Sequence, residues 1–278
     1  MEQFPVPTFH GGFKSVMSKL NSLLVSEKDV LQDVVNLDAF PIKDPGSKEY
    51  AQLISDCRKE LSRDGYCLLN GFVHEDALKQ MLSEAKSISD RAFHKTLTGN
   101  AYLTEIDESL PEGDPRKIID TTALAAVASD QIPNLHLIKR LYKSDILLNF
   151  IKDCLSYEKL YRYADPMSEL NLAFMKEGDY LRWHFDQTDF VVSILIEDCL
   201  KGGEYQVVPG IRNKDEENFD EVKKVLEGSL ERVQTLDIKP GCLVLFQGKY
   251  SIHRVTRIEG EKVRIVSLLA YDVKRSEE

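Results

Sequence analysis

The chain has 278 residues, of which 42% are hydrophobic and 29% charged, so it is long enough to bury one substantial core. Its 36 basic and 46 acidic residues give a formal charge of −10, which repels polyanions and makes nucleic acid an unexpected partner. Five scattered cysteines indicate reduced thiols, and no signal-peptide pattern or long apolar run is present, so we expect a cytoplasmic protein without a membrane partner.

The first part of the chain alternates helical patterns with proline-rich and turn-forming segments. Residues 1–46 contain four prolines and predict an irregular arm with one short helix around residues 13–25. Residues 47–63 repeat apolar side chains at helical intervals and predict a helix that Ser47 caps. Residues 66–72 then predict a short strand.

A second amphipathic helix is predicted for residues 74–89, which again gather apolar side chains on one face. Residues 101–117 are rich in turn formers and carboxylates and predict a long loop. Two further helices are expected between residues 117 and 157, because the stretch 135–155 keeps an apolar face for several turns. Residues 1–160 therefore predict a helix-rich support with one or two core strands.

After residue 165 the pattern changes to short apolar runs separated by glycine- and proline-containing turns. These runs are ELNLAF (169–174), FVVSILI (190–196), GEYQVVP (203–209), VQTLDI (233–238), CLVLFQ (242–247) and VRIVSLLAY (263–271). Helices followed by many short strands indicate a mainly β domain, in which residues 165–273 form an antiparallel sandwich or barrel supported by helices. We expect a single domain over residues 1–278.

The segment WHFDQTDF (183–190) places a histidine and an aspartate two positions apart, just before an apolar run. In an extended chain His184 and Asp186 project to one side, while Trp183 and Phe185 project to the other and are expected to pack in the core. Only His253 among the remaining histidines lies in the strand-rich half. Two imidazoles and one carboxylate can hold one face of an octahedral Fe(II), although a His-x-Asp pair taken alone is also typical of a structural hydrogen bond.

Arg264 follows His253 by eleven residues, beyond a turn at residues 259–260. A hairpin there returns the guanidinium beside the metal, where it can bind a carboxylate through two hydrogen bonds; the alternative is a surface ion pair. His-x-Asp, a distal His and this Arg together resemble the Fe(II)/2-oxoglutarate dioxygenases. The resemblance implies a double-stranded β-helix (jelly-roll) core, with His184, Asp186 and His253 as catalytic metal ligands. It also implies that Arg264 anchors the far carboxylate of the cosubstrate.

Residues 100–272 resemble one group of these enzymes more closely, through GDYLRWHFDQTDFVVSILIED, GGEYQVVPGIR and HRVTRIEGEKVRIVSLLAYD. This group includes the free-amino-acid (lysine-type) radical halogenases and their hydroxylase relatives. The resemblance implies that a glycine replaces the acidic ligand in the halogenating members, where it opens a site for chloride. Asp186 stands at that position here, so hydroxylation is expected and halogenation is disfavoured.

The chain departs from the superfamily at Val266, where many members have Ser or Thr as a second donor to the same carboxylate. Ser193, the polar residue in an otherwise apolar run, is the candidate replacement, since a buried hydroxyl requires a partner. Arg212 and Gln187 are candidate substrate-binding residues, with solvent exposure and a turn role as their respective alternatives. Residues 214–233 predict a solvated helix-bearing insertion, for which a lid over the site is the other interpretation.

The function expected from these residues is hydroxylation of an unactivated C–H bond with Fe(II), 2-oxoglutarate and dioxygen, supported by ascorbate as a reductant and yielding succinate and carbon dioxide. The resemblance favours a small polar substrate, a free amino acid, an amine or a derivative. The alternatives are a peptide or protein side chain as substrate, desaturation in place of hydroxylation, and a catalytically silent jelly-roll scaffold.

Overall fold

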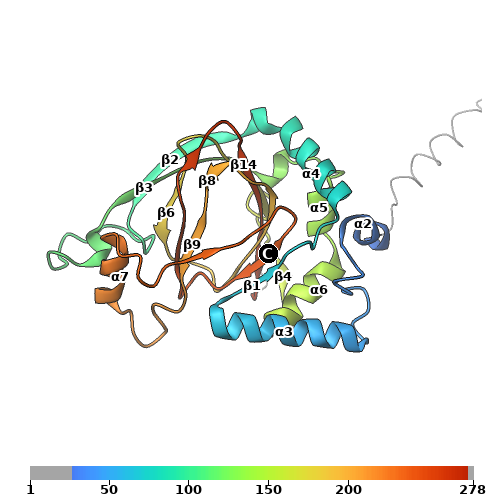
Figure 1. Cartoon of the computed structure of the whole chain (residues 1–278), viewed down its shortest axis with the longest axis horizontal. Coiled ribbons are helices and arrows are strands. Elements are labelled where there is room, and N and C mark those ends of the chain that lie inside the picture. The colour runs from blue at the N-terminus through green and yellow to red at the C-terminus, as the bar shows by residue number, and fades with distance from the viewer. Residues whose placement is uncertain (1–26, 275–278) are drawn as a thin grey trace, which may run out of the picture.

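The computed structural model describes residues 27–274, so the short helix predicted around residues 13–25 lies outside the described residues. Two antiparallel sheets face each other and enclose a cavity, and most helices lie together on one side of the sheets (Figure 1). This arrangement confirms the prediction of a mainly β jelly roll with helical support.

The larger sheet has seven strands in the order β1-β11-β7-β14-β5-β3-β2, all paired antiparallel. The strands are β1 Tyr66–Leu69, β2 Phe93–Gly99, β3 Asp120–Val127, β5 Leu170–Met175, β7 Val191–Glu197, β11 Leu243–Phe246 and β14 Arg264–Leu269. Alternate side chains face opposite sides, as the pleat of a strand requires. On β7, Val192 and Ile194 pack toward the helices, whereas Ser193 and Leu195 line the cavity.

The smaller sheet has four strands in the order β10-β9-β12-β6. They are β6 Leu181–His184, β9 Tyr205–Val208, β10 Gln234–Leu236 and β12 Ile252–Val255. Two short pairs, β13 Ile258–Glu259 with β8 Lys201–Gly202 and β15 Tyr271–Asp272 with β4 Tyr161–Arg162, complete the strands of residues 27–274.

Five helices build one core with the outer face of the larger sheet. They are α2 Glu27–Val34, α3 Lys48–Asp64, α4 Glu75–Ser87, α5 Leu137–Tyr142 and α6 Asp145–Cys154. The predicted cap of α3 is present, since the Ser47 hydroxyl accepts a hydrogen bond from the Tyr50 amide at 3.0 Å. The five cysteines are free thiols. Within residues 27–274 no helix is both long and apolar enough to cross a membrane.

Three elements differ from the sequence-based expectation. Helix α2 lies within the segment predicted as an irregular arm, and strands β2 and β3 had no predicted counterpart. Strand β2 is the edge of the larger sheet, and six of its seven residues are exposed, so it lacks the buried alternation that reveals a strand. Strand β3 is alanine-rich in its second half, a composition that favours helix in isolation.

Candidate metal centre

The two histidines of the candidate site lie opposite each other on neighbouring strands. His184 ends β6, and its register partner on β12 is His253. Leu181 and His184 are three residues apart on β6, whereas their register partners on β12, Val255 and His253, are only two residues apart. Strand β6 therefore contains a bulge. The bulge turns both Leu181 and His184 toward the cavity although they are three residues apart.

The aromatic neighbours of the ligands face the other side, as predicted. Trp183 and Phe185 are buried in a second hydrophobic cluster on the outer face of the smaller sheet. Helix α7 (Phe219–Leu226) contributes Val222 and Val225 to the same cluster. These contacts hold the chain on both sides of His184 and so fix the direction of its ring.

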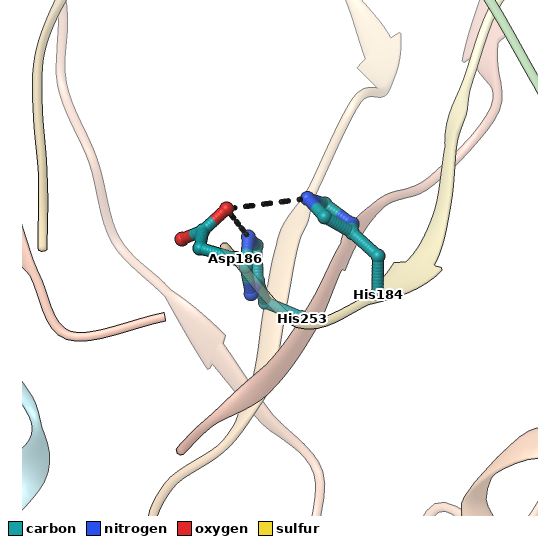
Figure 2. A group of neighbouring side chains, drawn as sticks. All are labelled: His184, Asp186 and His253. Atoms are coloured by element: carbon teal, nitrogen blue, oxygen red, sulfur yellow. Dashed lines mark ion pairs between the residues drawn. The ribbon is translucent and has the colours of Figure 1, made fainter. Parts of the chain in front are cut away.

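His184, Asp186 and His253 bring one ligand atom each to within 4.8 Å of one another. The Nε2 atoms of the two histidines lie 3.7 Å and 3.6 Å from the same oxygen, Oδ1 of Asp186, as Figure 2 shows. The two imidazole rings have centroids 4.1 Å apart and are tilted by 52°. Three donors converging from one side are the arrangement that a two-histidine, one-carboxylate metal site requires.

Backbone carbonyls fix the tautomer of both rings. His184 Nδ1 lies 2.9 Å from the carbonyl oxygen of Arg182, and His253 Nδ1 lies 3.0 Å from that of Ser251. Because a carbonyl oxygen only accepts, each Nδ1 carries the proton and each Nε2 presents its lone pair to the centre. The imidazoles are therefore oriented as metal ligands.

Burial of the two histidines changes their protonation in the direction that metal binding needs. Burial, with His253 as the second cause, lowers the pKa of His184 to about 3, and burial lowers the pKa of His253 to about 4. Both rings are neutral at physiological pH. Burial raises the pKa of Asp186, which His184 partly opposes, and Oδ2 of Asp186 has no hydrogen-bond partner. A divalent cation would balance the negative charge of Asp186 and accept the Nε2 lone pairs of both histidines. The three residues therefore fit a metal ion.

Gly248 is a site residue that the sequence analysis did not identify. A Cβ atom at this position would lie 1.7 Å from Oδ2 of Asp186 and 2.9 Å from Cε1 of His253. The carbonyl oxygen of Gly248 accepts a hydrogen bond from the Asp186 amide at 3.1 Å. Only a residue without a side chain leaves room for the carboxylate. The sequence does show a glycine five residues before the distal histidine. The role of this glycine depends on its contact with Asp186, which lies on another loop.

The ligands line a cavity of about 270 Å³ between the two sheets. Its wall is mostly apolar, and among the described residues Asp186 and Arg264 are its only formally charged members. Two hydroxyl-bearing side chains, Ser193 and Tyr205, complete the polar groups besides the histidines.

Arg264 begins β14 and reaches into this cavity, as predicted. Its side chain is 6% exposed, its Nε has no hydrogen-bond partner, and the nearest carboxylate oxygen, on Asp198, lies 3.7 Å from Nε. Burial lowers the pKa of Arg264, an effect that Asp198 only partly opposes. A buried guanidinium without a close counter-ion is a binding group for an anion.

The structure places Ser193 in the cavity but away from Arg264. Ser193 on β7 is the register partner of Leu268, which lies four residues after Arg264 on β14. At about 3.3 Å per residue, four residues correspond to about 13 Å along the sheet. The expectation that Ser193 shares a carboxylate with Arg264 is therefore not supported by its position.

Arg212 and Gln187 do not line the cavity. The Arg212 guanidinium lies 3.8 Å from the centroid of the Phe185 ring, forms an ion pair with Glu217 at 2.9 Å and donates from Nε to the Lys249 carbonyl. Gln187 donates from Nε2 to the carbonyl oxygens of Tyr102 and Leu103, 3.3 Å from each. These side chains tie together the loops behind the metal site, and a role for them in substrate binding stays a prediction.

The insertion at 214–233 is not wholly solvated. Helix α7 packs its apolar side on the outer face of the smaller sheet, and Phe219 contacts Tyr102 and Arg116. In Figure 1 this helix lies at the end of the molecule opposite α3 to α6. The insertion thus supports the strand that carries His184 from behind, and none of its residues is among those that line the cavity.

A family model described as Halogenase D matches residues 50–278. No curated protein matches the chain significantly.

Several solved structures share the fold. The epimerase SnoN in complex with Fe3+, alpha ketoglutarate and nogalamycin RO is 14% identical, with a TM-score of 0.54, covering 80% of this chain and 84% of that chain. An oxidoreductase of the 2OG-Fe(II) oxygenase family from Burkholderia pseudomallei is 14% identical, with a TM-score of 0.51 and coverages of 80% and 91%. AviO1 from Streptomyces viridochromogenes Tue57 is 14% identical, with a TM-score of 0.53 and coverages of 78% and 93%. At these identities the likeness shows a common fold.

Proposed function

The chain belongs to the Halogenase D family and has the fold of 2-oxoglutarate oxygenases, and on this premise we propose that it is an Fe(II)- and 2-oxoglutarate-dependent dioxygenase. The observation that carries the proposal is the convergence of His184, Asp186 and His253 in a cavity that also holds the guanidinium of Arg264, which has only a distant ion pair with Asp198 and no hydrogen bond at Nε. The metal ligands and the anion-binding group thus share one enclosed space.

Each of the four residues has a distinct part in this reaction. His184, Asp186 and His253 would hold Fe(II), with the two Nε2 atoms already facing the carboxylate. Arg264 would bind the far carboxylate of 2-oxoglutarate and so orient the keto-acid end toward the metal. Bound iron would supply the oxidation, in which dioxygen converts 2-oxoglutarate to succinate and carbon dioxide while a substrate C–H bond is hydroxylated.

We infer hydroxylation, not halogenation, from Asp186. By the resemblance stated above, halogenating relatives have a glycine at this position. Here the carboxylate is present, faces both histidines and has room because Gly248 has no side chain. A protein carboxylate in that place leaves no equivalent position for a halide. A chlorinated product would overturn this assignment.

The substrate class rests on different grounds. The family resemblance favours a free amino acid or derivative, which stays a prediction. The cavity wall, however, offers an ammonium group no carboxylate apart from the metal ligand Asp186, and burying an unpaired charge costs several kcal/mol. We therefore propose that the group that enters the cavity is apolar and that any charged ends of the substrate stay outside it. A peptide side chain is the alternative that the same wall accommodates.

Cosubstrate binding tests the proposal directly. We expect anaerobic addition of Fe(II) and 2-oxoglutarate to give a weak visible metal-to-ligand charge-transfer absorption. A His184→Ala/His253→Ala variant should lose this absorption at the same metal concentration, because it removes both imidazole ligands. A wild-type protein that folds but gives no absorption favours the silent scaffold.

Screening of candidate substrates tests the substrate class and the kind of oxidation. Amino acids, small amines and short peptides are tested for stimulation of succinate formation, with mass spectrometry of the products. We expect a gain of one oxygen; a loss of two hydrogens would identify desaturation instead.

A further inference from the structure

We infer that Tyr205 is the second group that binds the distal carboxylate of 2-oxoglutarate, where its hydroxyl donates a hydrogen bond beside the guanidinium of Arg264. The inference rests on the proposed function and adds a residue to it. It also replaces Ser193, which the register places about 13 Å from Arg264 along the sheet.

A second donor is needed because one guanidinium does not satisfy a buried carboxylate. Two carboxylate oxygens offer about four acceptor positions, and in a closed cavity water does not fill those that protein leaves free. Val266, two residues after Arg264, lines the cavity with a side chain that donates nothing. Met175, the register partner of Arg264 on β5, is likewise no donor. The donor must come from the facing sheet.

Tyr205 lies on strand β9 of the facing sheet, and it lines the cavity together with the metal ligands and Arg264. Its ring stacks on the metal ligand His253, with centroids 5.6 Å apart and an interplanar angle of 16°. The same ring packs against the apolar cluster that contains Met175, Val255 and Ile258. Met175 pairs directly with Arg264, and Tyr205, His253 and Arg264 line the same cavity, so the tyrosine links the part of the wall that holds the metal ligands to the part that holds the guanidinium.

The turn before Tyr205 brings its strand close to Arg264. A Cβ atom at Gly203 would lie 3.2 Å from Cδ of Arg264, so the backbone two residues before Tyr205 touches the arginine side chain.

The hydroxyl is available as a donor. Among the described residues, no group forms a hydrogen bond with it, although the tyrosine lines the cavity. A phenol keeps its proton at neutral pH and can donate it. Tyr205 and Ser193 are the only hydroxyl-bearing side chains that line the cavity within residues 27–274, and only Tyr205 is near Arg264.

The test compares Tyr205→Phe with Ser193→Ala as the matched control. Both changes remove one cavity hydroxyl, and the phenyl ring keeps the contacts with His253 and Met175. Affinity is measured by anaerobic titration of 2-oxoglutarate into the Fe(II)-loaded protein, followed by the charge-transfer absorption. We expect the tyrosine variant to bind about 10- to 100-fold more weakly, the loss typical of a hydrogen bond to a charged group. Ser193→Ala should leave the affinity unchanged.

A shorter cosubstrate separates binding of the distal carboxylate from support of the metal ligand. 2-Oxobutyrate has the same keto-acid end but lacks the second carboxylate, so Tyr205→Phe should bind it as the wild type does. Equal losses for both compounds would mean that the tyrosine acts through His253, which overturns the inference.

Rescue supplies an independent readout. Adding Val266→Ser to Tyr205→Phe restores a donor on the strand of Arg264, and we expect most of the 2-oxoglutarate affinity to return. A merely structural tyrosine would not be rescued by a hydroxyl on the opposite sheet. If the wild type itself binds no 2-oxoglutarate, the proposed function fails together with this inference. If it binds normally and Tyr205→Phe binds equally well, this inference alone fails.

Discussion

At the scale of single residues, Gly248 and Asp186 show how closely the site is packed. The carboxylate occupies the space that any side chain at 248 would fill, and the backbone of the same glycine accepts the Asp186 amide hydrogen bond. The position has no positive φ, so the requirement for glycine is one of space and not of backbone conformation.

We therefore expect Gly248→Ala to displace the carboxylate and weaken metal binding by about 10- to 100-fold, the usual effect of disturbing a group that orients a ligand. The measurement is Co(II) affinity from its visible absorption, with thermal unfolding of the metal-free protein to verify folding. Gly46→Ala, which meets only Asp44 Oδ1 at 3.9 Å, is the control. Unchanged metal affinity in Gly248→Ala would contradict the role of Asp186 as a ligand.

The sequence could reveal His184, Asp186, His253 and Arg264 because their chemistry, spacing and strand parity are local properties. It could not reveal Tyr205 or Gly248, since an aromatic residue in a strand and a glycine in a loop are common for many reasons. Their roles follow from what lies across the cavity. Ser193 shows the converse: its polarity within an apolar run was visible, but its distance from Arg264 depends on a strand register that only the fold supplies.

At the scale of elements, the turn between β8 and β9 holds Arg264 in place. Gly202 and Gly203 both have positive φ, and a Cβ atom at Gly203 would lie 2.3 Å from Sγ of Cys199 and 3.2 Å from Cδ of Arg264. Two adjacent glycines are typical of a plain tight turn. The structure adds a close approach to the anion-binding side chain.

Gly203→Ala should consequently destabilise the fold and weaken 2-oxoglutarate binding. Gly210→Ala should destabilise the fold but leave 2-oxoglutarate binding unchanged. Gly210 also has a positive φ, 54°, but a Cβ atom there meets nothing within 4 Å, so its substitution costs only about 1 kcal/mol of backbone strain. Denaturant unfolding and cosubstrate titration of the two variants make the comparison. Equal cosubstrate affinities would show that the turn does not position Arg264.

The elements that sequence patterns predicted well are those with one buried face, such as α3, α4 and the strands after residue 165. Strand β2 was missed because it is an exposed edge, and β3 because alanine carries little strand signal. The insertion 214–233 was interpreted from its charge, yet Val222 and Val225 on α7 decide where it packs.

At the scale of the whole molecule, the metal-free protein carries two buried neutral histidines, which makes its stability depend on pH. The pKa values of His184 and His253 are about 3 and about 4 in the folded chain but near 6.5 in an unfolded one. Below pH 6.5 the unfolded chain therefore takes up protons that the folded chain does not. The free energy of unfolding falls as the pH is lowered toward these folded values.

The expected slope between pH 6.5 and 5 approaches about 1.4 kcal/mol per pH unit for each histidine. Burial raises the pKa of Asp186, so this residue binds a proton more readily in the folded chain than in the unfolded one. Its protonation reduces the slope at the acidic end of the interval. Denaturant unfolding in a chelator across this interval measures the effect, and His184→Ala/His253→Ala is the comparison. A wild-type slope no steeper than that of the double variant would mean that the rings titrate normally.

Strand β14 is the last long strand of the chain, yet it lies in the middle of the larger sheet, between β7 and β5. Without it, the sheet would consist of two halves, β1-β11-β7 and β5-β3-β2, with no hydrogen bonds between them. Its first residue is Arg264, so the anion-binding end of the cavity is assembled in the same event that joins the halves. A chain in which β14 is unpaired thus lacks Arg264 at the cavity, so the strand that joins the two halves of the sheet also completes the proposed cosubstrate site.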